Sequence, residues 1–124
     1  MAQAIRAMPE EMPRELWRGY KPESALWQGS VAAIYVTPSS ADEMISLPQV
    51  RAFADRGLEG DRFFRDSWNA IKRSDKAVSL IEDEVLVLAA EELGVEGVGK
   101  LSRRNIATRG VALIDLLGRE FTVG

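Results

Sequence analysis

The sequence contains no cysteine and no histidine among its 124 residues. The missing cysteine excludes a disulfide framework and a Cys nucleophile. The two absences together exclude an ordinary zinc site, and the missing histidine excludes an imidazole general base. Chemistry carried by these residues must therefore use carboxylates, Lys, Arg, Tyr, Ser, Thr, backbone amides or a bound cofactor. The absence of cysteine also fits a reducing compartment.

Long apolar runs are missing as well. The longest wholly apolar stretches are residues 31–36 and 85–90, which are too short to cross a bilayer. Residues 1–28 carry charges throughout and include no stretch typical of a signal peptide. With 46% apolar and 28% charged residues, the chain is expected to be a globular cytoplasmic domain, or part of one, that binds no membrane.

Charge is unevenly distributed along this acidic chain, whose net charge is −3. Residues 62–76 hold five bases against two acids, and residues 100–109 hold four bases and no acid. Two basic islands in an acidic protein favour an anion site over a general polyanion surface, with solvated loops as the alternative. The second island has no interleaved aromatic residues, so we expect no nucleic-acid binding.

The pattern of apolar residues predicts about four or five short strands and a few short helices. Residues 1–28 are expected to be an irregular leader with a short helix at 11–20, because three prolines interrupt any longer one. Strands are predicted at 30–36, 50–54 and 77–81, and another at the C-terminal residues 119–123. Residues 101–108 are a mixed segment that could hold a short strand, and one or two helical turns are predicted at 112–117.

The clearest helix is predicted over residues 82–93, with Gly94 as its C-terminal stop. Ile81, Val85 and Leu88 would share one apolar face. The acids at 82–84 suit the positive end of the helix dipole, so they are better explained by helix stability than by catalysis.

The strongest local motif is Gly-Leu-Glu-Gly-Asp-Arg at residues 57–62. Its two glycines indicate a tight turn, and Asp61 could hold the guanidinium of Arg62 in one orientation. An oriented guanidinium is a good ligand for an oxyanion or phosphate, because its planar fork presents paired donors. The alternative is a turn with a local salt bridge.

A second motif, at residues 102–110, concentrates guanidiniums, an amide and a hydroxyl. In an extended segment, alternation would place Arg103 and Asn105 on one face and Arg104 on the other. An Asn beside an Arg suits a ligand that carries both amide-like edges and an anion. Gly110 would then permit the turn into the next helix.

The order of four segments resembles one known family. These segments are the strand Ser-Val-Ala-Ala-Ile-Tyr-Val at 30–36, Arg-Gly-Leu-Glu-Gly-Asp-Arg-Phe at 56–63, Val-Ser-Leu-Ile-Glu at 78–82, and Arg-Arg-Asn-Ile-Ala-Thr-Arg-Gly-Val at 103–111. Together they resemble the MOSC domain, the molybdenum cofactor sulfurase C-terminal domain, over residues 30–124. The resemblance implies a mostly β fold with short helices, of the α+β class, whose strands form a MOSC-like β-barrel. It divides the chain into a leader at 1–28 and a MOSC-like domain at 29–124.

The resemblance also implies binding of the molybdenum cofactor, a pterin that carries a phosphate, and a part in sulfur transfer. Some relatives reduce N-hydroxylated substrates at the molybdenum centre, and a cysteine desulfurase or an oxidoreductase is an expected partner. Pyridoxal phosphate is not expected, since no Lys is marked as a Schiff-base residue. The carried-over cofactor-binding residues are Asp61, Arg62, Ser79, Arg103, Asn105 and Arg109.

One departure from the family concerns its sulfur-binding or metal-ligating cysteine, which lies beyond the position that matches Gly124. We therefore expect an incomplete barrel, and we assign no catalytic residue and no metal ligand. Whether the chain is an enzyme stays open. The alternatives are a regulatory module that binds phosphorylated molecules, and a structural piece that pairs through its terminal strand.

Overall fold

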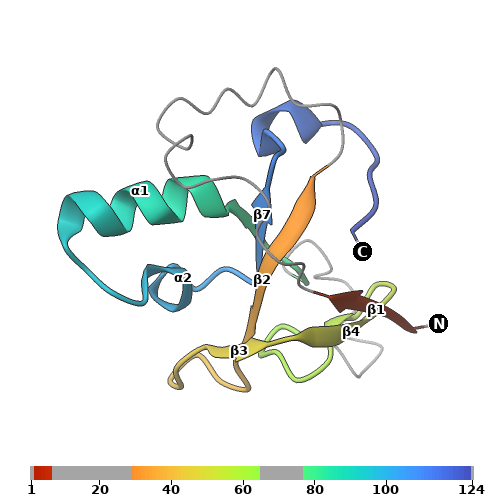
Figure 1. Ribbon diagram of the computed structural model, residues 1–124. Helices are drawn as coiled ribbons and strands as arrows, with labels where there is room; N and C mark the ends of the chain where they lie inside the picture. Colours follow the sequence, from red (N-terminus) through yellow and green to blue (C-terminus); the bar gives the residue numbers. More distant parts are fainter. Residues whose placement is uncertain (1, 7–28, 65–76, 124) are drawn as a thin grey trace.

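A computed structural model describes residues 2–6, 29–64 and 77–123 of the chain, which form two small sheets, two helices and a 3₁₀ turn (Figure 1). The first sheet has three antiparallel strands in the order β1-β4-β5, formed by Ala2–Arg6, Gln49–Phe53 and Gly57–Leu58. The second sheet has four strands in the order β3-β2-β7-β6, formed by Ile45–Leu47, Ser30–Val36, Ile106–Arg109 and Leu80–Glu82.

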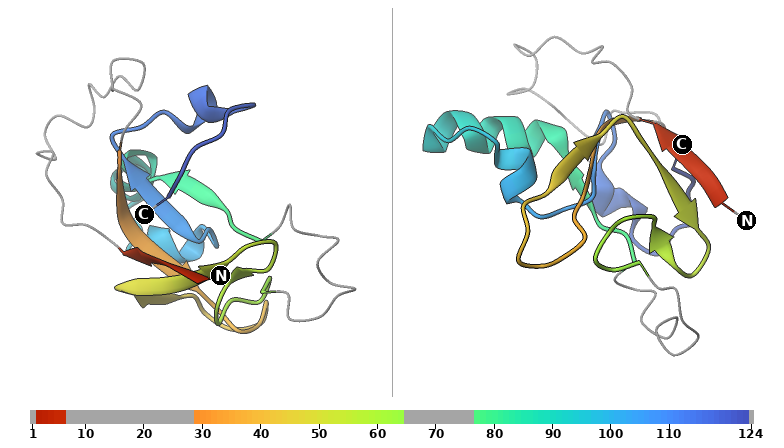
Figure 2. Two further views of the ribbon diagram at one scale, coloured as in Figure 1. Left: turned by 90° about the vertical axis from the view of Figure 1, so that its right-hand side faces the viewer. Right: turned by 90° about the horizontal axis from the view of Figure 1, so that it is seen from below.

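The second sheet is mixed. Strand β2 pairs antiparallel with both β3 and β7, whereas β6 runs parallel to β7. A register shift between Val31 and Ala33 marks a β-bulge in β2 opposite β7. A single residue, Pro48, separates β3 from β4, so the chain passes directly from one sheet to the other at this point (Figure 2).

The hydrophobic core lies between the two sheets. Its apolar side chains come from β1, β4 and β5 on one side and from β2 and β7 on the other: Ile5, Val50, Leu58, Val31, Ile34, Val36 and Ile106. Ile34, Leu58 and Ile106 are fully buried. Burying one such side chain contributes about 1.5–3 kcal/mol to the free energy of folding, so this cluster stabilises the packing of the two sheets.

Helix α1 (Asp83–Leu93) follows β6 without a loop and ends at Gly94, which has a φ of 63°. The short helix α2 (Val98–Leu101) packs against α1, on the side of the molecule away from β1 and β4 (Figure 1). After β7 the chain forms the 3₁₀ turn η4 (Leu113–Leu116). Within the described residues, no helix is long and apolar enough to span a membrane.

Several sequence-based predictions are confirmed. Strand β2 has the predicted bounds, β4 and α1 lie within one residue of theirs, and η4 falls inside the predicted helical segment. The α+β class holds, but neither sheet closes into a barrel within the described part of the chain.

Other predictions are wrong. Residues 2–6 form a strand paired antiparallel with β4 instead of irregular chain, and Ile5 of this strand is buried in the core. No strand forms at 119–123, where residues 119–122 are exposed, so that little apolar burial favours an ordered strand there. The strand predicted at 77–81 lies at Leu80–Glu82, and the mixed segment at 101–108 divides between the end of α2 and β7. The helix expected at 11–20 lies outside the described residues.

The inward face of α1 also differs from the prediction. Leu86 and Glu84 are buried, whereas Val85 is half exposed and Leu93 is largely exposed. The helix presents a carboxylate to the interior where the apolar pattern had placed Val85.

Candidate functional site

Ser79 and Asn105 meet directly. The Asn105 Oδ1 atom accepts hydrogen bonds from the Ser79 backbone N–H at 3.1 Å and from the Ser79 hydroxyl at 3.2 Å. The same hydroxyl accepts a hydrogen bond from the Asn105 backbone N–H at 3.1 Å. Ser79 directly precedes β6 and Asn105 directly precedes β7. Their hydrogen bonds therefore link the two parallel strands at the point where both begin.

Asn105 also binds β2. Its Nδ2 donates to the Tyr35 carbonyl at 3.0 Å, and its own carbonyl accepts from the Tyr35 N–H at 2.7 Å. The Asn105 side chain is buried, and both of its polar atoms have partners in the chain. A buried amide satisfied in this way ties three strands together, which is a structural role.

Asp61 is buried and accepts two backbone hydrogen bonds. Its Oδ1 accepts from the Thr37 N–H at 3.1 Å, and its Oδ2 from the Phe63 N–H at 3.4 Å. Thr37 is the first residue after β2, so Asp61 fixes the start of the loop at residues 37–44, hereafter the 37–44 loop. The carboxylate therefore orients backbone, and it does not orient the guanidinium of Arg62 as the sequence had suggested.

Arg62 contacts the other end of the 37–44 loop. Its Nη1 donates to the Met44 thioether sulfur at 3.5 Å, and its guanidinium carbon lies 4.7 Å from the centre of the Phe63 ring. A thioether sulfur is a weak hydrogen-bond acceptor. The contact with the ring face does not use the N–H groups that lie in the plane of the guanidinium. Within the described residues, no carboxylate pairs with Arg62.

Arg103 holds the tip of the same loop. Its Nη1 donates to the Asp42 carbonyl at 2.7 Å and its Nη2 to the Ser40 carbonyl at 3.0 Å. The predicted alternation fails here, because Arg103 has a φ of 62° and β7 begins only at Ile106. A left-handed conformation is costly for Arg, and these two hydrogen bonds help to hold it.

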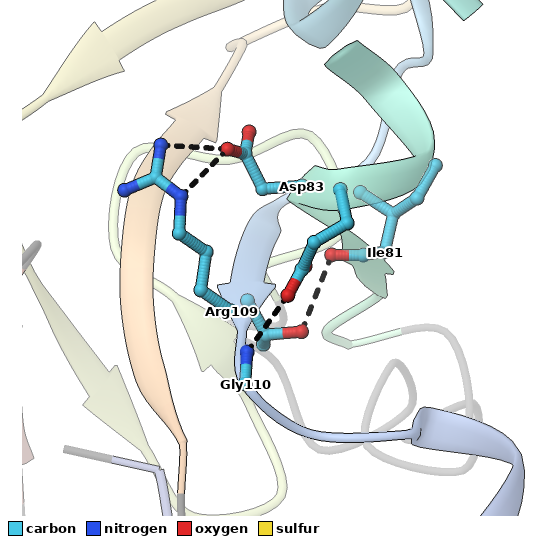
Figure 3. A network of polar contacts seen from close by, with 6 residues as sticks. Ile81, Asp83, Arg109 and Gly110 are labelled. Carbon is cyan, nitrogen blue, oxygen red and sulfur yellow. Dashed lines mark hydrogen bonds and ion pairs between the residues drawn. The ribbon is translucent and has the colours of Figure 1, made fainter. Parts of the chain in front are cut away.

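Arg109 forms an ion pair with Asp83, the first residue of α1 (Figure 3). Its Nε and Nη2 lie 2.9 and 2.7 Å from the same carboxylate oxygen, Oδ2. Tyr35 shares this environment. Burial raises the pKa of the Tyr35 phenol, the Asp83 carboxylate raises it further, and Arg109 partly opposes the shift.

The acids at 82–84 do more than complement the helix dipole. Glu82 accepts a hydrogen bond from the Leu113 N–H at 3.1 Å, and Glu84 accepts one from the Gly110 N–H at 2.9 Å. Sequence reasoning missed these two roles. One signal was present, since Glu84 stands three residues after Ile81 and four before Leu88, in line with the apolar face.

The six candidate residues thus separate into two groups. Asp61, Arg62 and Arg103 converge on the 37–44 loop, while Ser79, Asn105 and Arg109 hold β2, β6, β7 and α1 together. The groups adjoin through Tyr35, which binds Asn105 and lies two residues before Thr37. Apart from Arg62, the basic residues of the first island lie outside the described residues.

The described acids do not gather into a metal site, since no group of three or more comes close enough together to hold an ion. Comparisons with protein-family models, curated proteins and solved structures found no match to this chain.

Proposed function

We propose that this chain is a MOSC-type domain that binds the molybdenum cofactor through its phosphate, with Arg62 as the anion-binding residue. The observation that carries the proposal is the state of that side chain. Among the described residues, its Nη1 meets a thioether alone, and its guanidinium lies over a phenyl ring. A phosphate would supply the charged acceptor that these two neighbours do not provide.

The arrangement of the motifs supports this proposal. The 57–62 motif and the 102–110 motif both bind the stretch that runs from the end of β2 through the 37–44 loop. The Val-Ser-Leu-Ile-Glu segment contacts the 102–110 motif through the hydrogen bond between Ser79 and Asn105. The segments that carry the resemblance are therefore neighbours in space, as parts of one site should be. In this proposal the two sheets belong to the barrel-like fold of that family.

The residues fit the phosphate end of the cofactor. Asp61, Arg103, Asn105 and Arg109 already have partners in the chain, so their role would be to fix the loop and strands around Arg62. The ring of Phe63, next to Arg62, adds an apolar surface beside the anion donor. The cofactor would supply molybdenum redox and sulfur chemistry, whereas this chain would bind and orient it.

Sulfur transfer needs a thiolate, and these 124 residues contain no cysteine. In the proposed role the thiolate belongs to a partner of the cysteine desulfurase or oxidoreductase class. This chain contributes cofactor binding and no catalytic residue.

The test is to incubate the purified chain with molybdenum cofactor released from a molybdoenzyme and to measure retained pterin and molybdenum. The wild type and Arg51→Gln are expected to retain both, because Arg51 is an exposed arginine on β4 outside the site. Arg62→Gln is expected to lose retention. Equal retention by Arg62→Gln and the wild type, or no retention by any form, would overturn the proposal.

A second candidate is a phosphate-binding module without preference for a pterin. It is favoured by the same Arg62 geometry, because a guanidinium fork recognises phosphate whatever the rest of the ligand is. A competition assay separates the two. Inorganic phosphate and a nucleotide should compete poorly with a pterin phosphate for a cofactor-binding domain, and should compete equally well for a general phosphate module.

A further inference from the structure

Glu84 is a buried carboxylate with only one of its oxygens satisfied. It lies in the first turn of α1 and is 1% exposed. Its Oε2 accepts a hydrogen bond from the Gly110 N–H at 2.9 Å, whereas its Oε1 has no hydrogen-bond partner among the described residues. A charged oxygen removed from water without a donor is costly, so this geometry favours the neutral form of the side chain.

The surrounding charges act in the same direction. Burial raises the pKa of Glu84 most, the backbone N–H groups of Gly110 and of Glu84 itself lower it, and the neighbouring carboxylates of Glu82 and Asp83 raise it again. The nearby cation, Arg109 on β7, is bound to Asp83. The phenol of Tyr35 on β2 is neutral, and the charged groups of η4 and α2, Asp115 and Lys100, are exposed.

Three consecutive acids hold one chain reversal. Asp83 binds the Arg109 side chain and Glu84 binds the Gly110 N–H (Figure 3). Glu82 binds the Leu113 N–H. Gly110 has a φ of 80°, which glycine adopts without strain. This reversal, residues 109–113, carries the chain from β7 into η4 and so positions everything after it.

We propose that Glu84 is a proton-controlled latch, which docks the 109–113 reversal on α1 while protonated and loosens it when ionised. Ionisation places a charge on an oxygen that no described residue can solvate. Water must then reach Oε1, and it can do so when the reversal moves away from α1. This device lies apart from the 37–44 loop and does not depend on cofactor binding.

The sign of the pH effect follows from the raised pKa. The unfolded chain releases the Glu84 proton near the ordinary value of 4.5, whereas the folded chain keeps it to higher pH. Between these two values the folded state binds more protons, so the Glu84 contribution to stability falls as pH rises. Above the folded pKa the penalty is complete and the dependence on pH ends.

The experiment measures hydrogen exchange of the Gly110 amide by NMR from about pH 4 to about pH 8, corrected for the intrinsic pH dependence of exchange. In the wild type and in Glu96→Gln, which changes an exposed acid, the opening constant of Gly110 should rise by up to about tenfold per pH unit within the titration window. In Glu84→Gln the opening constant of Gly110 should not change with pH, because the glutamine side chain has no titratable proton in this range.

A second measurement keeps the proposal falsifiable if Glu84→Gln does not fold. The carboxyl carbon of Glu84 in the wild type should titrate above its ordinary value by NMR. Titration at or below that value, or the same Gly110 profile in Glu84→Gln and the wild type, would overturn the latch.

Discussion

Asn105 holds Ser79 at both its backbone and its hydroxyl, through one side-chain oxygen with hydrogen bonds of 3.1 and 3.2 Å. The two residues stand 26 positions apart and precede the parallel strands β7 and β6. The Asn105 amide nitrogen extends the same link to Tyr35 on β2. One side chain therefore sets the register of the middle of the mixed sheet.

Replacing this amide should destabilise the fold. Asn105→Asp keeps an acceptor for Ser79 but turns the Nδ2 donor into an oxygen that faces the Tyr35 carbonyl. We expect a loss of about 1–3 kcal/mol in the free energy of unfolding, since a buried acceptor is left without a donor. Urea denaturation measures it, with Ser46→Ala on the exposed edge of β3 as the control. Unchanged stability in Asn105→Asp would contradict this structural role.

Arg103 should act on the 37–44 loop through its guanidinium and on stability through its backbone. Arg103→Gln and Arg103→Gly both remove the hydrogen bonds to Ser40 and Asp42, but only glycine relieves the φ of 62°. The glycine variant should be more stable than the glutamine variant by about 1 kcal/mol. Both should shift the amide resonances of residues 40–42 similarly. A glutamine variant with wild-type resonances there would show that Arg103 does not hold the loop.

Gly99 on α2 packs against the hydroxyl of Tyr35, and a Cβ at this position would come into close contact with that oxygen. Alanine is the better helix former, by about 1 kcal/mol, but the clash should outweigh this gain. We expect Gly99→Ala to lower the melting temperature. Adding Tyr35→Phe should recover part of the loss, because the hydroxyl is the nearest atom. A double-mutant cycle measures the coupling, and simple additivity would refute the contact.

The phenol of Tyr35 should report the charges around it. Burial is the largest cause of its raised pKa, with Asp83 raising it and Arg109 lowering it. Asp83→Asn should therefore lower the pKa of Tyr35, whereas Arg109→Gln should raise it. Tyrosinate absorbance measures both shifts, and Tyr35→Phe identifies the signal against Tyr20. Shifts of the same sign in both variants would contradict the arrangement of these three groups.

Local chemistry explains what the sequence could predict. The β-branched run that ends before Pro38 predicts the bounds of β2, and the apolar period with Gly94 at its end predicts α1. The tight turn predicted for the 57–62 motif is confirmed only in part: Gly57–Leu58 form β5 and the turn follows at residues 59–60, with positive φ at Gly57 and Gly60. In each case the signal lies within a few residues.

The features that could not be predicted depend on distant partners. Glu84 meets Gly110 and Asp83 meets Arg109, each 26 positions away, so no local pattern identifies either partner, although the position of Glu84 in line with the apolar face marks it as inward-facing. Arg103 was assigned to a ligand, but its fork binds two carbonyls more than 60 positions earlier. Residue type identifies side chains that can donate hydrogen bonds, but the tertiary contacts decide which partners these donors meet.

The central claim is that Arg62 is the available anion donor of this site. Calorimetric titration of the chain with a pterin phosphate tests it most directly, using the wild type, Arg62→Gln and Arg51→Gln. A hydrogen bond to a charged group contributes about 1.5–3 kcal/mol, so Arg62→Gln should weaken binding by roughly 10- to 100-fold. Arg51→Gln should bind as the wild type does. Equal affinity in Arg62→Gln and the wild type would contradict the claim.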